Sequence, residues 1–321
     1  MTARLRIGTR GSDLALWQAR TVERALAHVG VESELVIIRT AGDRLQQASL
    51  SEVGGKRLFV KEIEDALMSG TVDLAVHSAK DMPAVLPPGL VLAATLSRDD
   101  PRDAFVLPAG TPAGEFAAVQ ALLGGTPAIG TSSVRRAAQL AALFPRATFE
   151  PIRGNVDTRL RKLNDSGYDA LVLAAAGLRR LGLGDRITTT VPVEACCPAP
   201  GQGIIAVEIR AVDDGARIAL RAIHNEEAGI CLTAERALVA ALGGGCQLPL
   251  GAVARRRGDA LEMHAAVASP GGSRIIRRSG RGPSADPAGL GKGLAAELVR
   301  DGAMEILETV RRSDGPVEGS Y

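Results

Sequence analysis

The sequence predicts an α/β protein with two α/β domains, followed by a third domain of the α+β class. Over the first two thirds of the chain, short apolar runs alternate with amphipathic helical runs, which is typical of a largely parallel sheet covered by helices. This alternation occurs twice, and a polar run at 97–103 separates the two occurrences. The remaining third alternates instead like antiparallel strands flanked by helices.

The first domain is expected to begin with a strand and a capped helix. Ser12 and Asp13 follow the first apolar run as helix-capping residues, and Gly30 ends the helical pattern. The expected elements, in order, are a strand at 5–10, a helix at 13–30, a strand at 34–40, a helix at 59–70 and a buried strand at 74–78. A polar, glycine-containing loop at 41–57 separates the second strand from the second helix.

The second domain repeats the same alternation. Its expected elements are a strand at 127–132, a helix at 133–144, a strand at 147–152, a helix at 155–167 and a strand at 169–178 that runs on into a helical turn. The run PAPGQG at 198–203 breaks the pattern, and the strand-like run at 204–210 after it could cross back to the first domain. Two crossing segments, near 97–103 and 195–203, would form a hinge.

The third domain is expected to hold a helix, three antiparallel strands and one closing helix. These are the helix at 226–242, the strands at 250–256, 261–269 and 273–281, and the helix at 289–312. The predicted domains are therefore 1–99 with 200–221, then 102–197, then 225–313, with a flexible tail at 314–321.

Composition excludes several classes of protein. The net charge of +2 and an aromatic content of 2% argue against a nucleic-acid binder. No apolar run approaches the ~18 residues needed to span a bilayer, and the N-terminus lacks a secretion signal, so we expect a cytoplasmic protein. Four cysteines without a Cys-x-x-Cys pair are expected to be reduced thiols, and four scattered histidines predict no metal site.

The basic residues are mostly arginine, and several fall where ligands bind in α/β sheets. Only five of the 38 basic residues are lysine. The junction TSSVRR at 131–136 places hydroxyls and two guanidinium groups at a predicted helix start, which suits an anion; simple capping by Ser132 or Ser133 is the alternative. Together with Arg153 and Arg159, these arginines indicate a ligand with several carboxylates.

Two further residues are candidates for chemistry. Asp81 follows Lys80 at the end of the strand at 74–78, from where a carboxylate can face a cleft and act on protons or steady a developing cation. A surface turn is the alternative. Cys246 lies in the run GGGCQLPLG, whose glycines could present the thiol for reaction, whereas a small buried thiol in a turn is the alternative.

Nine motifs spread along the chain point to one family. They are RIGTRGSDLALWQA, VGGKRLFVKEIE, DLAVHSAKDMP, DDPRDAFV, IGTSSVRRAAQL, IRGNVDTRLRKL, LAAAGLRRLGL, PGQG and GGGCQLPLGA. In this order they resemble the porphobilinogen deaminase family over nearly the whole chain. The resemblance implies that the first two domains are similar to the two lobes of type II periplasmic binding proteins, with the active site between them.

The resemblance also implies an activity and a cofactor. The protein would be a transferase of tetrapyrrole and haem biosynthesis that condenses four porphobilinogen molecules head to tail, releases ammonia and yields the linear tetrapyrrole hydroxymethylbilane. Cys246 would carry a dipyrromethane cofactor through a thioether, and four additions would build a hexapyrrole on it. A monomer is expected, with its product passed to uroporphyrinogen-III synthase.

Site residues carried over from the family fall into four groups. Asp81 would be catalytic, stabilising positive charge and assisting proton transfer, and Lys56 and Phe59 would lie on a loop that covers the cleft. The cofactor's carboxylates would be held by Ser78, Lys80, Asp81, Thr131, Ser132, Ser133, Arg135 and Arg136. The substrate end would be lined by Arg10, Ser12, Arg153, Arg159 and Arg180, with Gln202 at the crossing between domains.

Two rival functions stay open at this point. A two-lobed protein that binds a polycarboxylate without catalysis would carry no covalent adduct and would not need Cys246. A nucleic-acid binder would use Arg135, Arg136 and the run at 255–257, but the weak net charge and few aromatics disfavour it.

Overall fold

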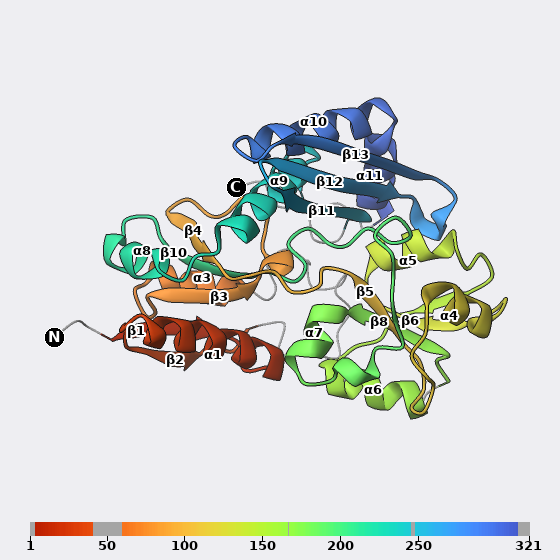
Figure 1. Ribbon diagram of the computed structural model, residues 1–321, viewed down its shortest axis with the longest axis horizontal. Helices are drawn as coiled ribbons and strands as arrows, with labels where there is room; N and C mark the ends of the chain where they lie inside the picture. The colour runs from red at the N-terminus through yellow and green to blue at the C-terminus, as the bar shows by residue number, and fades with distance from the viewer. Residues whose placement is uncertain (1–3, 41–59, 166, 245–247, 314–321) are drawn as a thin grey trace.

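Two sheets of five strands and one sheet of three strands form the framework of the protein. The structure, a computed structural model, describes residues 4–40, 60–165, 167–244 and 248–313. Figure 1 shows the first α/β unit on the left, the second on the right and the C-terminal unit above the junction of the two. The predicted fold class is confirmed, whereas the predicted domain boundaries remain a proposal.

The first α/β unit contains a mixed sheet. In sheet order its strands are β2 (Ser33–Ile37), β1 (Leu5–Thr9), β3 (Leu74–Ser78), β10 (Ile205–Arg210) and β4 (Leu90–Thr95). β1 runs parallel to β2 and β3, whereas β10 runs antiparallel to β3 and β4. The predicted return of the run at 204–210 to the first sheet is therefore confirmed.

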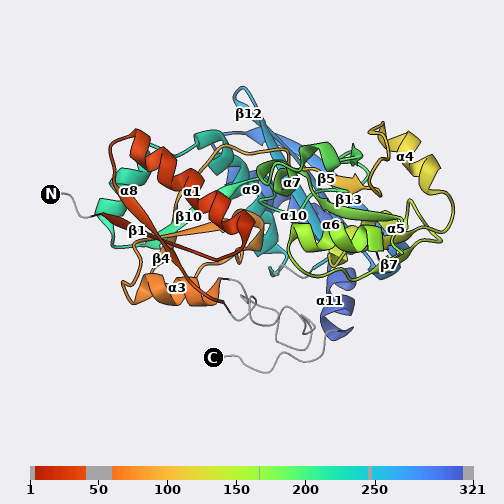
Figure 2. The ribbon, with the colours of Figure 1, turned by 90° about the horizontal axis from the view of Figure 1, so that it is seen from below.

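Helices cover both faces of this first sheet. Leu26 of α1 (Asp13–His28) and Leu220 of α8 (Asp214–Arg221) pack on one face, and Leu67 of α3 (Lys61–Met68) packs on the other. Figure 2 shows α1 and α3 on opposite sides of the sheet. Strands buried on both faces are apolar throughout, as the run LAVHS indicates for most of β3.

The second α/β unit has the same strand order. Its strands are β7 (Thr148–Glu150), β6 (Ala128–Gly130), β8 (Ala170–Ala174), β5 (Asp103–Val106) and β9 (Thr189–Thr190). β5 is the antiparallel strand in this sheet, as β10 is in the first. Its helices are α4 (Phe116–Leu123), α5 (Val134–Ala141), α6 (Val156–Asp165), α7 (Ala175–Arg180) and the short η2 (Gly184–Arg186).

The prediction of largely parallel sheets was incomplete. Each five-stranded sheet receives one antiparallel strand directly after the chain crosses between the units: β5 follows the first crossing and β10 the second. The sequence pattern predicts a polar connection up to Asp103, because an acidic residue at the start of a buried strand breaks the apolar pattern. Besides β5, the pattern did not reveal β4, β9, α4 and α8.

The C-terminal unit packs helices against one face of an antiparallel sheet. Its elements are α9 (Glu226–Ala241), β11 (Leu250–Arg257), β12 (Ala260–Ala268), η3 (Pro270–Gly272), β13 (Ile275–Pro283), α10 (Pro287–Arg300) and α11 (Ala303–Ser313). The single closing helix predicted at 289–312 was wrong. Gly302 adopts a φ of +92°, which ends α10 and turns the chain into a separate helix.

The two crossing segments lie against one another and against the end of β3. Gly203 has a φ of +87°, and a Cβ there would lie 2.5 Å from the carbonyl oxygen of Asp99 in the first crossing. A Cβ on Gly201 would lie 2.9 Å from the carbonyl carbon of Ala79. The glycines of PGQG therefore allow two backbones to approach closely where the units meet.

A buried carboxylate joins both crossings to the C-terminal unit. Glu235 of α9 is fully buried and accepts hydrogen bonds from the backbone N–H of Gly201 (2.6 Å) and of Ala254 (2.7 Å). It also binds the guanidinium of Arg98, whose Nε donates to the backbone carbonyl of Gln202 at 2.9 Å.

Within the described residues, no helix is both long and apolar enough to span a bilayer.

The contact between the crossings yields a stability prediction. Gly203→Ala should lower the thermal unfolding midpoint, because it adds a clash with Asp99 to the ~1–2 kcal/mol that a side chain costs at positive φ. Gly182→Ala is the matched control, since Gly182 has a φ of +73° with open space around its Cβ position. Differential scanning calorimetry should show the larger drop for Gly203→Ala; equal drops would contradict the close contact.

Candidate active site

The end of β3 presents the first group of candidate residues. The strand ends at Ser78, and the 3-10 turn η1 (Ala79–Asp81) follows, closed by a hydrogen bond from the N–H of Met82 to the carbonyl of Ala79 at 3.3 Å. Ser78 Oγ accepts a hydrogen bond from Gln18 Nε2 at 2.7 Å. Asp81 is exposed at the end of this turn, and Lys80 is partly exposed.

Burial is the main influence on the ionisation of Lys80. Burial lowers the pKa of Lys80 to about 8; the charges of Asp81 and Asp103 oppose this shift, whereas those of Arg136 and Arg135 add to it. Lys80 is therefore a cation below about pH 8. Lys80 lines the same cavity as Ser133 and Arg135, so the end of β3 in the first unit faces the start of α5 in the second.

The TSSVRR junction combines capping with a turn in the backbone. Ser133 is the N-cap of α5, and its Oγ accepts from the N–H of Arg136 at 3.4 Å, so capping is confirmed for this serine. Thr131 is buried, and its Oγ1 accepts from the N–H of Ser133 at 3.2 Å. Ser132 is exposed and donates its hydroxyl to the carbonyl of Ile152 at 2.7 Å.

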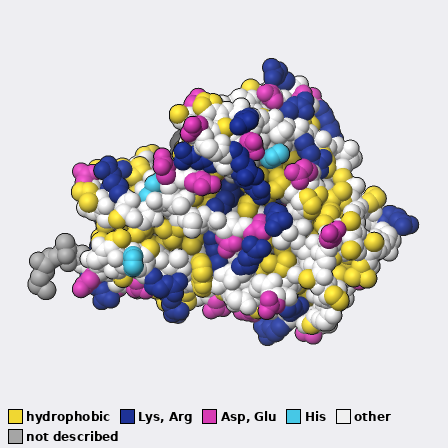
Figure 3. Space-filling view, viewed as in Figure 1, with side chains coloured by type: hydrophobic (Ala, Val, Ile, Leu, Met, Phe, Trp, Pro, Cys, Tyr) yellow, Lys and Arg dark blue, Asp and Glu magenta, His cyan; other side chains and the backbone are white. Residues whose placement is uncertain are grey.

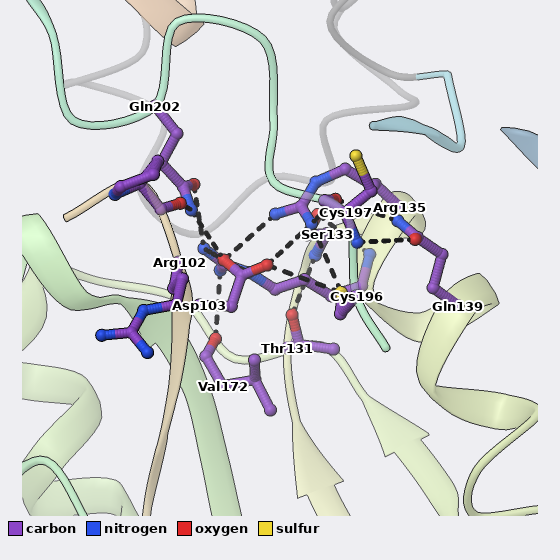
Figure 4. A network of polar contacts seen from close by, with 12 residues as sticks. Arg102, Asp103, Thr131, Ser133, Arg135, Gln139, Val172, Cys196, Cys197 and Gln202 are labelled. Atoms are coloured by element: carbon purple, nitrogen blue, oxygen red, sulfur yellow. Dashed lines mark hydrogen bonds and ion pairs between the residues drawn. The ribbon is translucent and has the colours of Figure 1, made fainter. Parts of the chain in front are cut away.

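The two arginines of this junction are buried and share the carboxylate of Asp103, which Figure 4 shows beside Arg135. Arg135 donates from Nη1 to Asp103 Oδ2 at 2.7 Å and from Nη2 to Asp103 Oδ1 at 3.1 Å. Arg136 donates from Nε to Asp103 Oδ1 at 2.8 Å. Burial opposes ionisation of Asp103, but the charges of Arg135 and Arg136 hold its pKa well below the ordinary value.

Neutral groups complete the contacts of these arginines. Arg135 Nη1 also donates to the carbonyl of Cys197 at 2.8 Å, and Arg136 Nη1 donates to the carbonyl of Val172 at 3.0 Å. Gln202 reaches in from the second crossing, and its Nε2 donates to Asp103 Oδ1 at 2.9 Å and to the carbonyl of Pro101 at 2.6 Å. Both crossings and α5 therefore meet at Asp103.

The residues predicted for the substrate end divide into two places. In α6, Arg159 donates from Nε to the carbonyl of Gly154 at 2.9 Å, and burial together with the charge of Arg136 lowers the pKa of Arg159 to about 10. Arg180 of α7 instead donates from Nη2 to the carbonyl of Gly203 and lies 5.6 Å from the ring centroid of Trp17. Arg180 is thus engaged at the crossing, where Asp99 lies 3.9 Å from its Nε.

The remaining predicted residues lie at element ends. Arg10 directly follows β1, and Ser12 is the N-cap of α1 but makes no side-chain capping bond there. Arg153 precedes α6 and is partly exposed. Cys246, Lys56 and Phe59 lie outside the residues that the structure describes.

A cavity of about 80 Å³ connects the three units. Its wall includes Lys80 of the first unit, Ser133 and Arg135 of the second, and Arg236 and Leu248 of the C-terminal unit. Leu248 is two residues beyond Cys246 in the sequence. Figure 3 shows Lys and Arg side chains next to Asp and Glu side chains in the centre of its face, where the units meet.

The other three cysteines are buried, and the structure gives them no reactive setting. Burial raises the pKa of Cys196 to about 12 and that of Cys231 to about 11, and it also raises the pKa of Cys197. Thiols with raised pKa values are weak nucleophiles at neutral pH. In the described part of the chain, no three His, Cys, Asp or Glu side chains group as a metal site would require.

Sequence reasoning missed the acids and amides that hold the candidate residues. Asp103, Glu235, Gln18 and Gln139 are all buried, and each bonds a residue or backbone segment of the site. Asp103 lay within the quoted motif DDPRDAFV. The available signal was an acid followed directly by the apolar run AFV, which indicates a buried carboxylate that needs a cationic partner.

Solved structures offer a distant likeness in fold. The VFT2 domain of BvgS from Bordetella pertussis aligns with a TM-score of 0.40 and 16% identity, covering 68% of this chain and 85% of that one. An ancestral cationic amino acid solute-binding protein aligns with a TM-score of 0.40 and 14% identity, covering 68% and 86%.

Sequence relatives are much closer. Porphobilinogen deaminase of Acidithiobacillus ferrooxidans is 46% identical over 311 residues, which cover 96% of this chain and 99% of the relative. That of Roseiflexus sp. is 48% identical over 309 residues, with the same coverage of both chains. That of Methylobacillus flagellatus is 46% identical over 303 residues, covering 94% of this chain and 96% of the relative.

Two family profiles also match. Residues 5–217 match the profile described as porphobilinogen deaminase, dipyromethane cofactor binding domain, and residues 229–300 match that described as porphobilinogen deaminase, C-terminal domain. The two matches span all three sheets and the cluster around Asp103. The chain therefore belongs to the porphobilinogen deaminase family.

Proposed function

We propose that this chain condenses four porphobilinogen molecules head to tail, with release of ammonia, to give hydroxymethylbilane, and that a dipyrromethane cofactor on Cys246 primes the reaction. Family membership supports the activity and the cofactor. One observation supports placing the cofactor here: Lys80, Ser133 and Arg135 line one cavity together with Leu248, which is two residues beyond Cys246 in the sequence.

The charges around this cavity fit a carboxylate-rich group. Burial lowers the pKa values of Lys80 and Arg159, and neighbouring positive charge adds to both shifts, from Arg136 and Arg135 at Lys80 and from Arg136 at Arg159. Each pyrrole of a dipyrromethane carries carboxylate side chains, which relieve such an excess of positive charge. Hydrogen bonds to charged groups contribute about 1.5–3 kcal/mol each, although desolvation offsets part of this.

The proposed roles of the chain's own groups follow from their positions. When bound, the dipyrromethane supplies a free pyrrole α-carbon as the nucleophile for the first incoming substrate. Ser133, Arg135 and Arg136 would hold its carboxylates, with Ser78, Lys80, Thr131 and Ser132 around them. Arg10, Ser12, Arg153, Arg159 and Gln202 would face the substrate, and we propose Arg180 as a support at the crossing.

Asp81 is the proposed catalytic carboxylate. Each condensation forms one carbon–carbon bond, breaks one carbon–nitrogen bond and passes through a substrate cation as ammonia leaves. The carboxylate of Asp81, exposed where β3 ends, would stabilise that positive charge and accept the proton that the attacking pyrrole α-carbon loses once the new carbon–carbon bond has formed. Cytoplasmic location, a monomeric state and transfer of the product to uroporphyrinogen-III synthase remain predictions.

Cofactor attachment is tested by intact-protein mass spectrometry. The wild-type chain should exceed its sequence mass by two linked pyrrole units, and Cys246→Ser should lack this excess because the thioether cannot form. Cys231→Ser is the control, since Cys231 is buried in α9 and should leave the adduct in place. An active wild-type protein at its unmodified mass would disprove the proposal.

The role of Asp81 is tested by Asp81→Asn. The adduct should still form, while kcat for ammonia release should fall by about 10²–10⁴-fold, because the amide removes both the negative charge and the proton acceptor. Asp65→Asn, at an exposed carboxylate on α3, should keep wild-type turnover. Comparable turnover in both variants would show that Asp81 has been assigned the wrong role.

A further inference from the structure

The carboxylate of Asp103 stands out among the groups that the proposed mechanism does not use. Its side chain is fully buried, and it forms short contacts with two guanidinium groups and one amide. Two cations and one anion leave this cluster with one net positive charge. Its position at the start of β5, directly after the first crossing, fixes it to the sheet of the second unit.

We propose that Asp103 is a positioning residue, whose carboxylate orients Arg135 and Arg136 so that their remaining N–H groups face the carboxylates of the cofactor. The inference rests on the proposed function. A guanidinium has five N–H donors in a rigid fork, so bonds from two of its nitrogens fix the direction of the others. Asp103 accepts two such hydrogen bonds from Arg135 and at least one from Arg136. These bonds hold the buried side of both guanidinium groups in place.

Asp103 also limits the repulsion between the cations of the site. The charged groups that face Lys80 are Asp81 from η1, Arg135 and Arg136 from α5, and Asp103 from β5. Arg236 of α9 lines the same cavity. Among these groups, Asp103 is the acid held between the two arginines, and its charge adds to that of Asp81 in favouring the protonated form of Lys80.

Gln202 gives the same carboxylate a contact with the second crossing. Its side-chain Nε2 donates to Asp103 and to the backbone carbonyl of Pro101, while the backbone carbonyl of Gln202 accepts a hydrogen bond from Arg98. The orientation of the two arginines is therefore fixed relative to both segments that join the α/β units. These hydrogen bonds hold the two guanidinium groups in fixed positions, as a binding site requires. A misplacement of such a group by about 1 Å can lower the reaction rate about 10²-fold.

The proposal is tested with Asp103→Asn and a matched control, Asp100→Asn. Asp100 lies in the same crossing and pairs with Arg102 at 2.7 Å and Arg179 at 3.2 Å, away from α5. Adduct mass, kcat and KM for porphobilinogen, and the pH dependence of kcat/KM are measured for each. Asp103→Asn should load less cofactor and lose about 100-fold in kcat/KM, whereas Asp100→Asn should match the wild type.

The pH profile separates positioning from a general loss of structure. Removing the charge of Asp103 leaves Lys80 beside two uncompensated cations, which lowers the pH at which Lys80 loses its proton. The alkaline limb of kcat/KM should therefore move to lower pH in Asp103→Asn and stay in place in Asp100→Asn. Coincident profiles, or equal loading of the two variants, would overturn the proposal.

A charge-balanced variant covers the case in which Asp103→Asn does not fold. Asp103→Asn/Arg135→Gln restores the one net positive charge of the cluster, so it should fold and keep the alkaline limb at the wild-type pH. This double variant should still load less cofactor than the wild type. Cofactor loading and a KM for porphobilinogen equal to those of the wild type would contradict the positioning role of Asp103 and Arg135. A wild-type protein without any adduct would instead refute the proposed function itself.

Discussion

The buried ion cluster around Asp103 is the constraint on which the rest of the site depends. A carboxylate without surface exposure cannot remain ionised unless cations and hydrogen-bond donors surround it, and Arg135, Arg136 and Gln202 supply them. Removing one partner of such a pair costs about 3–5 kcal/mol, because the other charge stays buried. The cluster therefore fixes α5, β5 and the second crossing relative to one another, and with them the positions of the cations that face the cavity.

The C-terminal unit is tied to the same region by a second buried acid. Glu235 of α9 binds backbone groups of the second crossing and of β11 together with Arg98 of the first crossing. Apolar contacts reinforce this, since Ala228 and Leu232 of α9 pack against Ala79 and Ile204. The segment that carries Cys246 follows α9, so the acid that joins the units also sets where this segment begins.

Much of the fold could be predicted because apolar periodicity reflects burial directly. The strand LAVHS, the return of the run at 204–210 and the antiparallel C-terminal sheet followed from this pattern. The start of β5 at Asp103 could not be found in this way, because a buried acid looks like a surface residue until its partners, 32 and 33 residues further along the chain, are known. The break at Gly302 depended on a positive φ that a helical pattern does not reveal. Candidate residues came from motifs, whereas supporting residues such as Gln18 and Gln139 required three-dimensional contacts.

A crystal structure of the protein purified with its cofactor would test the central claim most directly, namely that the cations beside Asp103 form the cofactor site. The account predicts a thioether at Cys246 and cofactor carboxylates within about 3 Å of N–H groups of Arg135 and Arg136, with Asp103 still bound to both arginines. Cofactor carboxylates bound elsewhere, with Arg135 and Arg136 in contact only with protein groups, would contradict it.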